Sequence, residues 1–223
     1  DWSVTGVQTC ALPIYLQQAL FNLPPGNWDA GERGLASLPG RDEEFSASIC
    51  RAIAYARHLN LSRLHCMAGI RDQSIDHQAQ RDIYVSRLRQ AAQLCTDNSI
   101  QLLIEPINPF DIPGYFLNDF GLALDILAEV NTAGPDLLKL QFDIYHCRKI
   151  HGDVPGWLEK CRTHTAHLQI AGVPDRHEPD HGNLPLAEIL QVCAELHPDL
   201  WIGCEYRPKA QTEAGLQWMK PYL

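Results

Sequence analysis

The sequence predicts an α/β fold of the (β/α)-barrel type, because three features of the chain agree. Short apolar runs that read as strands alternate with longer stretches that read as helices. Several strand runs are apolar on both faces, which is typical of a parallel sheet covered by helices. Long polar loops follow strands, notably at residues 22–41 and 172–183, and barrels build their active sites from such loops.

In the N-terminal half, the apolar run Leu16–Leu23 predicts the first strand. Glu43–Leu59 carries apolar residues at helical spacing and predicts the first helix. The short apolar run Arg63–Met67 predicts a second strand, and the longer stretch Asp76–Thr96 predicts a second helix. The continuous apolar run Ile100–Pro106 predicts a third strand, so this half alternates regularly between the two element types.

The C-terminal half repeats the pattern, with longer helix-like stretches between short apolar runs. We expect helices at Asp119–Val130, Val154–Cys161, Leu184–Leu196 and from Thr212, and strands at Leu137–Ile144, His164–Ala171 and Leu200–Glu205. Such alternation is typical of either an open doubly wound sheet or a closed barrel. No GxGxxG or GxxxxGK[ST] motif follows a strand, so the nucleotide-binding open sheets lose support and the barrel is favoured.

The expected strands number six, whereas a complete (β/α)8 barrel has eight in about 250 residues. Residues 1–14, DWSVTGVQTCALPI, have no helical or alternating period and resemble translated sequencing-adapter read-through. We therefore predict a non-native leader at 1–14 and one barrel domain at 15–223, with the first two βα units missing upstream. An ordinary irregular N-terminus is the alternative.

Composition limits the classes of function. Apolar residues make up 45% of the 223-residue chain and charged residues 20%, the profile of a soluble globular protein. No apolar run approaches the roughly 18 residues that cross a membrane, and no signal peptide is evident. The net charge of −9 argues against a binder of phosphate backbones, which needs a basic face, but it does not exclude a small anionic substrate. We expect neither nucleic acid nor membrane as a partner, and a homo-oligomer stays open.

The eight cysteines include no CxxC pair, and several lie inside apolar runs. This distribution favours buried, reduced thiols over disulfides or metal ligands. Reduced thiols indicate a cytoplasmic protein.

Four strand ends carry an oxygen-bearing side chain. They are Glu105, Asp143, Gln169 and Glu205, separated by 38, 26 and 36 residues. One barrel repeat averages about 31 residues, so these side chains would converge at the barrel mouth. A single carboxylate of this kind is more often an ion-paired or capping residue, but burying one unpaired at the end of an apolar strand is costly. Four in register favour a metal site.

The ligand set contains only oxygen, which favours Mg²⁺ or Mn²⁺ over Zn²⁺. A hard cation beside two glutamates suits proton transfer next to a carbonyl group. One glutamate would remove a carbon-bound proton, and the other would return it to the neighbouring carbon of an enediolate.

Eight short segments then carry a family resemblance. They are FNLPPGNW at 21–28, AGERG at 30–34, IEPIN at 104–108, FDIPGY at 110–115, FDIYH at 142–146, HLQIA at 167–171, GCEY at 203–206 and TEAGL at 212–216. Together they resemble the hydroxypyruvate isomerase family, within the xylose isomerase-like TIM-barrel superfamily. The resemblance covers residues 16–223.

The resemblance implies metal ligands at Glu105, Asp143, Gln169 and Glu205, with Glu105 and Glu205 also forming the catalytic acid–base pair. It implies interconversion of hydroxypyruvate and 2-hydroxy-3-oxopropanoate, a small anionic sugar acid. The matching positions also imply substrate contacts by three further residues: His146, Arg176 and Asp111. A guanidinium at Arg176 would suit the substrate carboxylate. The alternatives are a structural histidine, a solvated cation and a turn-forming aspartate.

Two departures from the family pattern bear on the substrate. After Arg176 the family reads like GEPGTGE, whereas this chain reads HEPDHGN at 177–183 and places Asn183 where a glutamate is expected. Phe21 stands where some relatives carry histidine. Some relatives act on four-carbon 2-oxo sugar acids, and these departures could follow such a change.

Three other functions stay open. A 2-oxo-tetronate isomerase or ketose 3-epimerase of the same superfamily would share the metal site and differ in the pocket. A zinc-dependent DNA-repair endonuclease of that superfamily needs more histidine ligands and a basic groove. A barrel lacking its first quarter could be an inactive fragment with unpaired strand edges.

Overall fold

The computed structural model describes residues 17–134 and 136–222. The expected leader at 1–14 lies outside the described residues. The chain forms two compact units. Of the described residues, the first unit contains 17–104, 114–116, 126–134 and 136–139, and the second contains 105–113, 117–125 and 140–222.

Three parallel strands organise the first unit: β1 (Phe21–Asn22), β2 (Arg63–His65) and β3 (Gln101–Ile104). Phe21 pairs with Leu64, and Leu64 with Leu102. Strand β1 is shorter than the predicted Leu16–Leu23. Most of the shortening is at the N-terminal end, where residues 17–20 form no strand, while beyond Leu23, which donates to His65, Pro24 and Pro25 have no N–H to continue the ladder.

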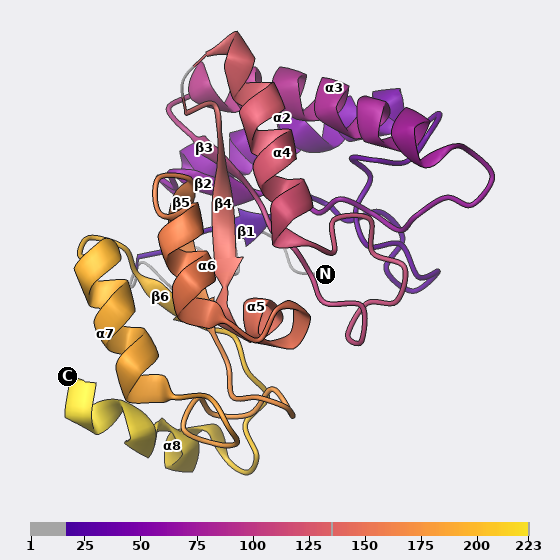
Figure 1. Ribbon diagram of the computed structural model, residues 1–223. Helices are drawn as coiled ribbons and strands as arrows, with labels where there is room; N and C mark the ends of the chain where they lie inside the picture. The colour runs from indigo at the N-terminus through magenta and orange to yellow at the C-terminus, as the bar shows by residue number, and fades with distance from the viewer. Residues whose placement is uncertain (1–16, 135, 223) are drawn as a thin grey trace. The chain divides into compact units, whose positions relative to one another are not determined.

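Two long helices, α2 (Asp42–His58) and α3 (His77–Thr96), lie side by side in this unit (Figure 1). Both match the predicted helices within one residue. Helix α2 begins with acidic residues and ends with basic ones, which complements its dipole. Asp76 caps α3 by accepting the N–H of Gln78 at 2.8 Å.

Arg87 of α3 ties these helices to the preceding loop. Its side chain is 4% exposed, donates to Asp42 at 3.0 Å and donates to the carbonyls of Leu35 and Leu38 at 2.8 and 2.6 Å. Because lysine cannot reproduce this fork, Arg87→Lys should lower the free energy of unfolding by about 1–3 kcal/mol. Urea unfolding measures this change. The exposed Arg57→Lys is the matched control, and equal midpoints for both variants would contradict the assignment.

The second unit contains three parallel strands. They are β4 (Leu138–Asp143), β5 (Thr165–Ile170) and β6 (Ile202–Cys204), and the part of β4 that belongs to this unit begins at Leu140. Asp143 pairs with Gln169, and Gln169 with Gly203, so the ends of these strands are in register. The predicted strand Leu200–Glu205 is shortened to three residues.

Helices follow each strand of this unit: α5 (Ile144–Ile150), α6 (Val154–Cys161), α7 (Leu186–Leu196) and α8 (Thr212–Gly215), continued by the 3-10 helix η3 (Leu216–Tyr222). Helices α6 and α7 lie side by side (Figure 1). Helix α4 (Phe120–Val130), followed by the 3-10 turn η2 (Asn131–Ala133), is shared between the units. The second core includes Phe120 and Phe142, whose ring centroids are 4.8 Å apart.

Helix α5 was not predicted. Asp143 ends β4 and immediately caps α5, accepting the N–H groups of Tyr145 and His146 at 2.7 and 3.4 Å. Only seven residues long, α5 has too few turns to show a helical period in the sequence.

Among the described cysteines, five are buried and only Cys50 and Cys204 are exposed. Burial raises the pKa of Cys95 to about 12 and of Cys193 to about 11, so neither forms thiolate at neutral pH. Among the described cysteines, iodoacetamide should therefore label the exposed Cys50 and Cys204 in the native protein, and the five buried thiols only after denaturation. Peptide mass spectrometry checks this order. Native labelling of Cys95 as fast as Cys50 would contradict the fold.

No helix within residues 17–134 and 136–222 combines the length and apolar character that crossing a bilayer requires.

Candidate active site

The second unit holds all seven residues that the sequence predicts for the site. Glu105 comes directly after β3 in the chain, Asp143 ends β4, Gln169 lies in β5 and Glu205 follows β6. The other three, Asp111, His146 and Arg176, lie on the segments that follow these strand ends.

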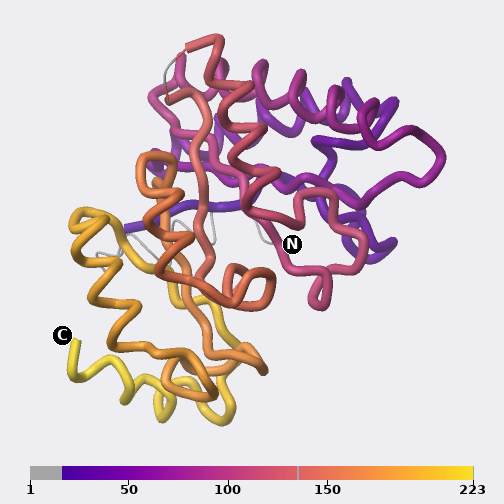
Figure 2. The backbone as a smooth tube through the Cα atoms, in the orientation of Figure 1, coloured from indigo at the N-terminus to yellow at the C-terminus, as the bar shows by residue number. Residues whose placement is uncertain are grey.

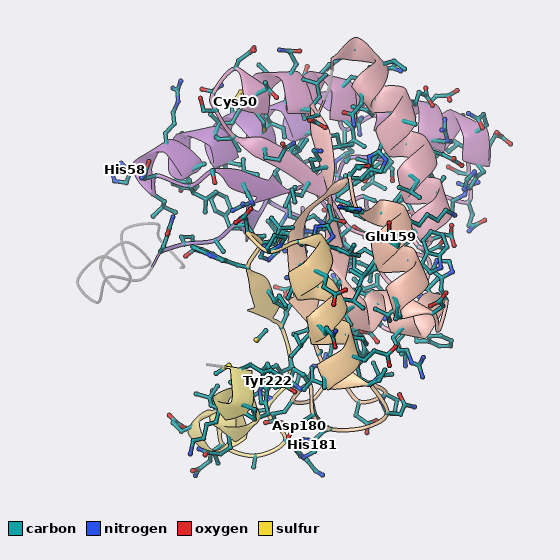
Figure 3. The ribbon with its side chains drawn as sticks, turned by 60° about the vertical axis from the view of Figure 1, so that its left-hand side comes forward. Cys50, His58, Glu159, Asp180, His181 and Tyr222 are labelled. Carbon is teal, nitrogen blue, oxygen red and sulfur yellow. The ribbon has the colours of Figure 1, made fainter. Side chains whose placement is uncertain are left out.

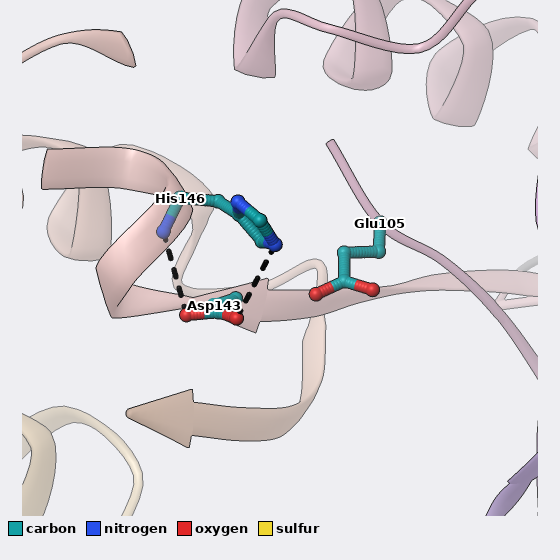
Figure 4. Close-up of side chains that lie close together, drawn as sticks. All are labelled: Glu105, Asp143 and His146. Atoms are coloured by element: carbon teal, nitrogen blue, oxygen red, sulfur yellow. Dashed lines mark hydrogen bonds and ion pairs between the residues drawn. The ribbon is translucent and has the colours of Figure 1, made fainter. Parts of the chain in front are cut away.

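Glu105 and Asp143 form a buried acidic pair. Their side chains are 4% and 1% exposed, and a carboxylate oxygen of each lies within 4.8 Å of the other and of a His146 ring nitrogen (Figure 4). Burial, followed by repulsion from Asp143 and Glu205, raises the pKa of Glu105 well above its ordinary value. Burial also raises the pKa of Asp143 to about 6, although Arg176 and backbone N–H groups oppose the rise. A cation bound beside the two carboxyl groups would stabilise their charged forms.

Gln141 bridges two of the predicted ligands, and sequence reasoning missed it. Its amide Nε2 donates to Glu105 Oε2 at 2.9 Å and to Gln169 Oε1 at 2.7 Å. The signal was present, because residues 141 and 143 of a strand point to the same face. Gln169 and Glu105 are therefore connected by hydrogen bonds to the same Gln141 amide.

Arg176 bridges the remaining carboxylates. It donates to Asp111 Oδ2 and Glu205 Oε2, each at 3.1 Å, and lies 3.7 Å from Asp143 Oδ2. Burial works against the charged guanidinium, but these carboxylates prevail and raise the pKa of Arg176. Glu205 is more exposed than the buried pair, at 58%, and joins Asp143 through this guanidinium.

The long loop between β5 and α7 positions Arg176 and can be followed in orange in Figure 2. Arg176 has a φ of +58°, and its carbonyl accepts the N–H of Arg207 at 2.8 Å. Gly172 anchors the loop, because a Cβ there would lie 2.6 Å from the carbonyl oxygen of His181. Further along, Asp180 and His181 are exposed (Figure 3), as is Asn183.

His146 lies beside the acidic pair, and Asp111 lies beside Arg176 and Tyr145. Tyr145 donates its hydroxyl to Asp111 Oδ1 at 3.1 Å, while Arg176 holds the other oxygen. His146 is buried, which lowers its pKa to about 3 and keeps the ring neutral at pH 7. Its Nε2 lies 3.6 Å from Asp143 Oδ2.

The donor set fits a hard divalent cation. Asp143 Oδ2 is buried and accepts no hydrogen bond from the described residues. Glu105, Asp143, Gln169 and Glu205 offer only oxygen, the ligand that Mg²⁺ and Mn²⁺ prefer. Glu105 and Asp143 lie close together with His146. The Gln141 amide lies between Gln169 and Glu105, and the Arg176 guanidinium lies between Glu205 and Asp143.

Known proteins resemble this chain over nearly its whole length. The family model described as xylose isomerase-like TIM barrel matches residues 12–222. A 2-oxo-tetronate isomerase from Cupriavidus necator (strain H16) is 49% identical over 208 residues, covering 93% of this chain and 79% of the relative. A hydroxypyruvate isomerase from Escherichia coli (strain K12) is 40% identical over 222 residues, covering 100% and 85%.

A solved structure described as AP endonuclease, family 2, from Brucella melitensis superposes with a TM-score of 0.94. It is 37% identical, covering 100% of this chain and 84% of that one. This similarity confirms the predicted barrel-type fold class, in which the chain presents six strands among its described residues. The named relatives are isomerases, in agreement with the predicted enzyme class. The chain belongs to the xylose isomerase-like TIM-barrel family.

Proposed function

We propose that this protein is a divalent-metal-dependent isomerase that interconverts hydroxypyruvate and 2-hydroxy-3-oxopropanoate. The observation that carries the proposal is the buried Glu105–Asp143 pair at the strand ends, with Gln169 and Glu205 joined to it. The 40% identity to a hydroxypyruvate isomerase over the whole chain supports the substrate class.

Glu105, Asp143, Gln169 and Glu205 would hold the cation, Mg²⁺ or Mn²⁺. When bound, the cation supplies Lewis acidity that polarises the substrate carbonyl and hydroxyl oxygens. Each of the four side chains would supply an oxygen ligand. Glu105 follows β3, while the other three lie at or near the ends of β4, β5 and β6. The buried Asp143 Oδ2, which accepts no hydrogen bond from the described residues, is the best-placed donor.

The two glutamates would move the proton. One carboxylate removes a proton from C3 of hydroxypyruvate, and the other delivers a proton to C2 of the enediolate, while the hydroxyl proton passes from O3 to O2 so that the C3 aldehyde and the C2 hydroxyl group form. Burial raises the pKa of Glu105, which brings it nearer to the range in which a carboxyl group can both accept and donate at neutral pH. Microscopic reversibility exchanges the two roles in the reverse direction.

Three side chains would orient the substrate. Arg176 presents a guanidinium suited to bidentate binding of the substrate carboxylate. His146 faces the acidic pair and Asp111 faces the guanidinium of Arg176, and from these positions both would hydrogen-bond substrate oxygens. The expected partner is thus a small anionic sugar acid.

A second candidate is 2-oxo-tetronate isomerisation, because a relative of that name is the more similar of the two, at 49% identity. The altered loop at 177–183 and Phe21 are the positions at which the pocket would differ. The endonuclease reading has less support, because the net charge of −9 and the oxygen-rich donor set suit neither a phosphate backbone nor zinc.

A substrate panel tests the proposal. Initial rates with hydroxypyruvate and a four-carbon 2-oxo sugar acid would be measured with Mg²⁺ or Mn²⁺ and after chelation. We expect metal-dependent turnover, with the larger kcat/KM identifying the substrate. Turnover of neither acid in the presence of metal would overturn the proposed function.

A further inference from the structure

Asn108 is a fully buried side chain three residues after Glu105, and its amide orientation is fixed. The side-chain oxygen Oδ1 accepts the backbone N–H groups of Phe110 and Asp111, each at 3.0 Å. A reversed amide would point its NH₂ group at two N–H donors. The oxygen therefore faces these two N–H groups, and the Nδ2 group faces the other way.

His146 receives that Nδ2 group. Its ring nitrogen Nδ1 lies 2.7 Å from Asn108 Nδ2 and 3.3 Å from the backbone N–H of the same residue. Both groups are donors, so Nδ1 must present its lone pair to them. In a neutral imidazole the hydrogen then resides on Nε2.

The other end of the ring faces the acidic pair. Nε2 lies 3.6 Å from Asp143 Oδ2, beside Glu105 (Figure 4). A ring nitrogen that carries hydrogen has no lone pair for a metal ion, although its position alone would allow coordination with the two carboxylates. The same N–H group could donate to a ligand oxygen held at the pair.

We infer that Asn108 is a positioning residue that fixes His146 in the Nε2–H form, which makes His146 a hydrogen-bond donor to substrate and not a metal ligand. The assignment to substrate rests on the proposed function, whereas the tautomer follows from the hydrogen bonds alone. The hydrogen bonds of the Asn108 side chain lead to His146 and to the backbone of Phe110 and Asp111, so we assign Asn108 a role through His146.

Nitrogen-15 NMR of histidine-labelled protein tests the inference without any turnover. The chain has ten histidines, so His146→Gln identifies the His146 signals by their loss. In the wild type we expect an unprotonated Nδ1 and a protonated Nε2, before and after addition of Mg²⁺. A protonated Nδ1, or loss of the Nε2 proton when Mg²⁺ binds, would overturn the inference.

The variant Asn108→Asp provides a second test of the inference. One carboxylate oxygen can still cap Phe110 and Asp111, while the other presents an acceptor to Nδ1 instead of a donor. We expect Nδ1 to become protonated, and kcat to fall further than KM changes. Asn60→Asp adds the same charge at an exposed loop residue and should leave the His146 signals unchanged.

Unchanged His146 signals in folded Asn108→Asp would overturn the inference. If that variant does not fold, the wild-type spectrum alone still decides the tautomer. If the wild-type tautomer is Nε2–H but neither acid is turned over, the positioning contact stands and only the proposed function fails.

Discussion

Glu105→Gln should lower kcat by about 10²–10⁴-fold while the chain keeps its fold. Glutamine fills the same space but can neither accept the carbon-bound proton nor offer a charged oxygen to a cation. The buried carboxyl group already resists ionisation, so its replacement by a neutral amide should leave the melting temperature unchanged or raise it. Steady-state kinetics and circular dichroism melting measure the two effects separately.

Glu159→Gln is the matched control for this variant. Glu159 lies on α6 (Figure 3), and its side chain is 63% exposed, so its substitution should change neither rate nor stability. Wild-type kcat in Glu105→Gln would remove Glu105 from the mechanism. A variant that is both inactive and unfolded would shift the test to Glu205→Gln, whose exposed side chain makes loss of the fold less expected.

Arg176→Met should lower kcat/KM by about 30-fold to several thousand-fold, which corresponds to about 2–5 kcal/mol for removing one partner of a hydrogen-bonded charge pair. The loss should appear largely in KM, because a guanidinium that holds the substrate carboxylate contributes to ground-state binding as well. Arg176→Lys should recover part of the loss, since lysine restores the charge but not the planar fork.

Arg207→Met is the control for the loop itself. The backbone N–H of Arg207 donates to the carbonyl of Arg176, and its own carbonyl accepts from His177, so both contacts survive the substitution. The exposed Arg207 side chain has no role in the proposed site. Equal losses in Arg176→Met and Arg207→Met would mean that general loop damage or net charge, and not the guanidinium, causes the effect.

Much of the fold could be predicted because the strands and long helices have clear apolar periods. Helix α6 appears with the predicted bounds, and α3 differs by its capping residue alone. Strand β1 and helix α5 could not be placed in the same way. The apolar run that predicts β1 extends over residues 17–20, which form no strand, and α5 depends on a cap from Asp143, an interaction that apolar spacing does not record.

The candidate site, like the fold, could be predicted only in part. Spacing of one repeat between strand ends led to Glu105 and Asp143, which the structure brings together. Gln141 was missed because its one signal, a strand face shared with Asp143, does not distinguish an amide that contacts ligands from any other polar residue of a strand. The role of Asn108 depends on the orientation of its side-chain amide. That orientation follows only from the hydrogen bonds that its Oδ1 and Nδ2 atoms make. Sequence reasoning thus finds the charged groups more readily than the neutral groups that orient them.

The most direct test of the central claim follows hydroxypyruvate by proton NMR in ²H₂O with the purified chain and Mg²⁺. A metal-assisted proton transfer by Glu105 and Glu205 predicts loss of the C3 proton signals and formation of the aldehyde product. It also predicts that chelation stops both changes and that added Mg²⁺ restores them. Exchange and product formation that continue at the same rate after complete chelation would contradict the account.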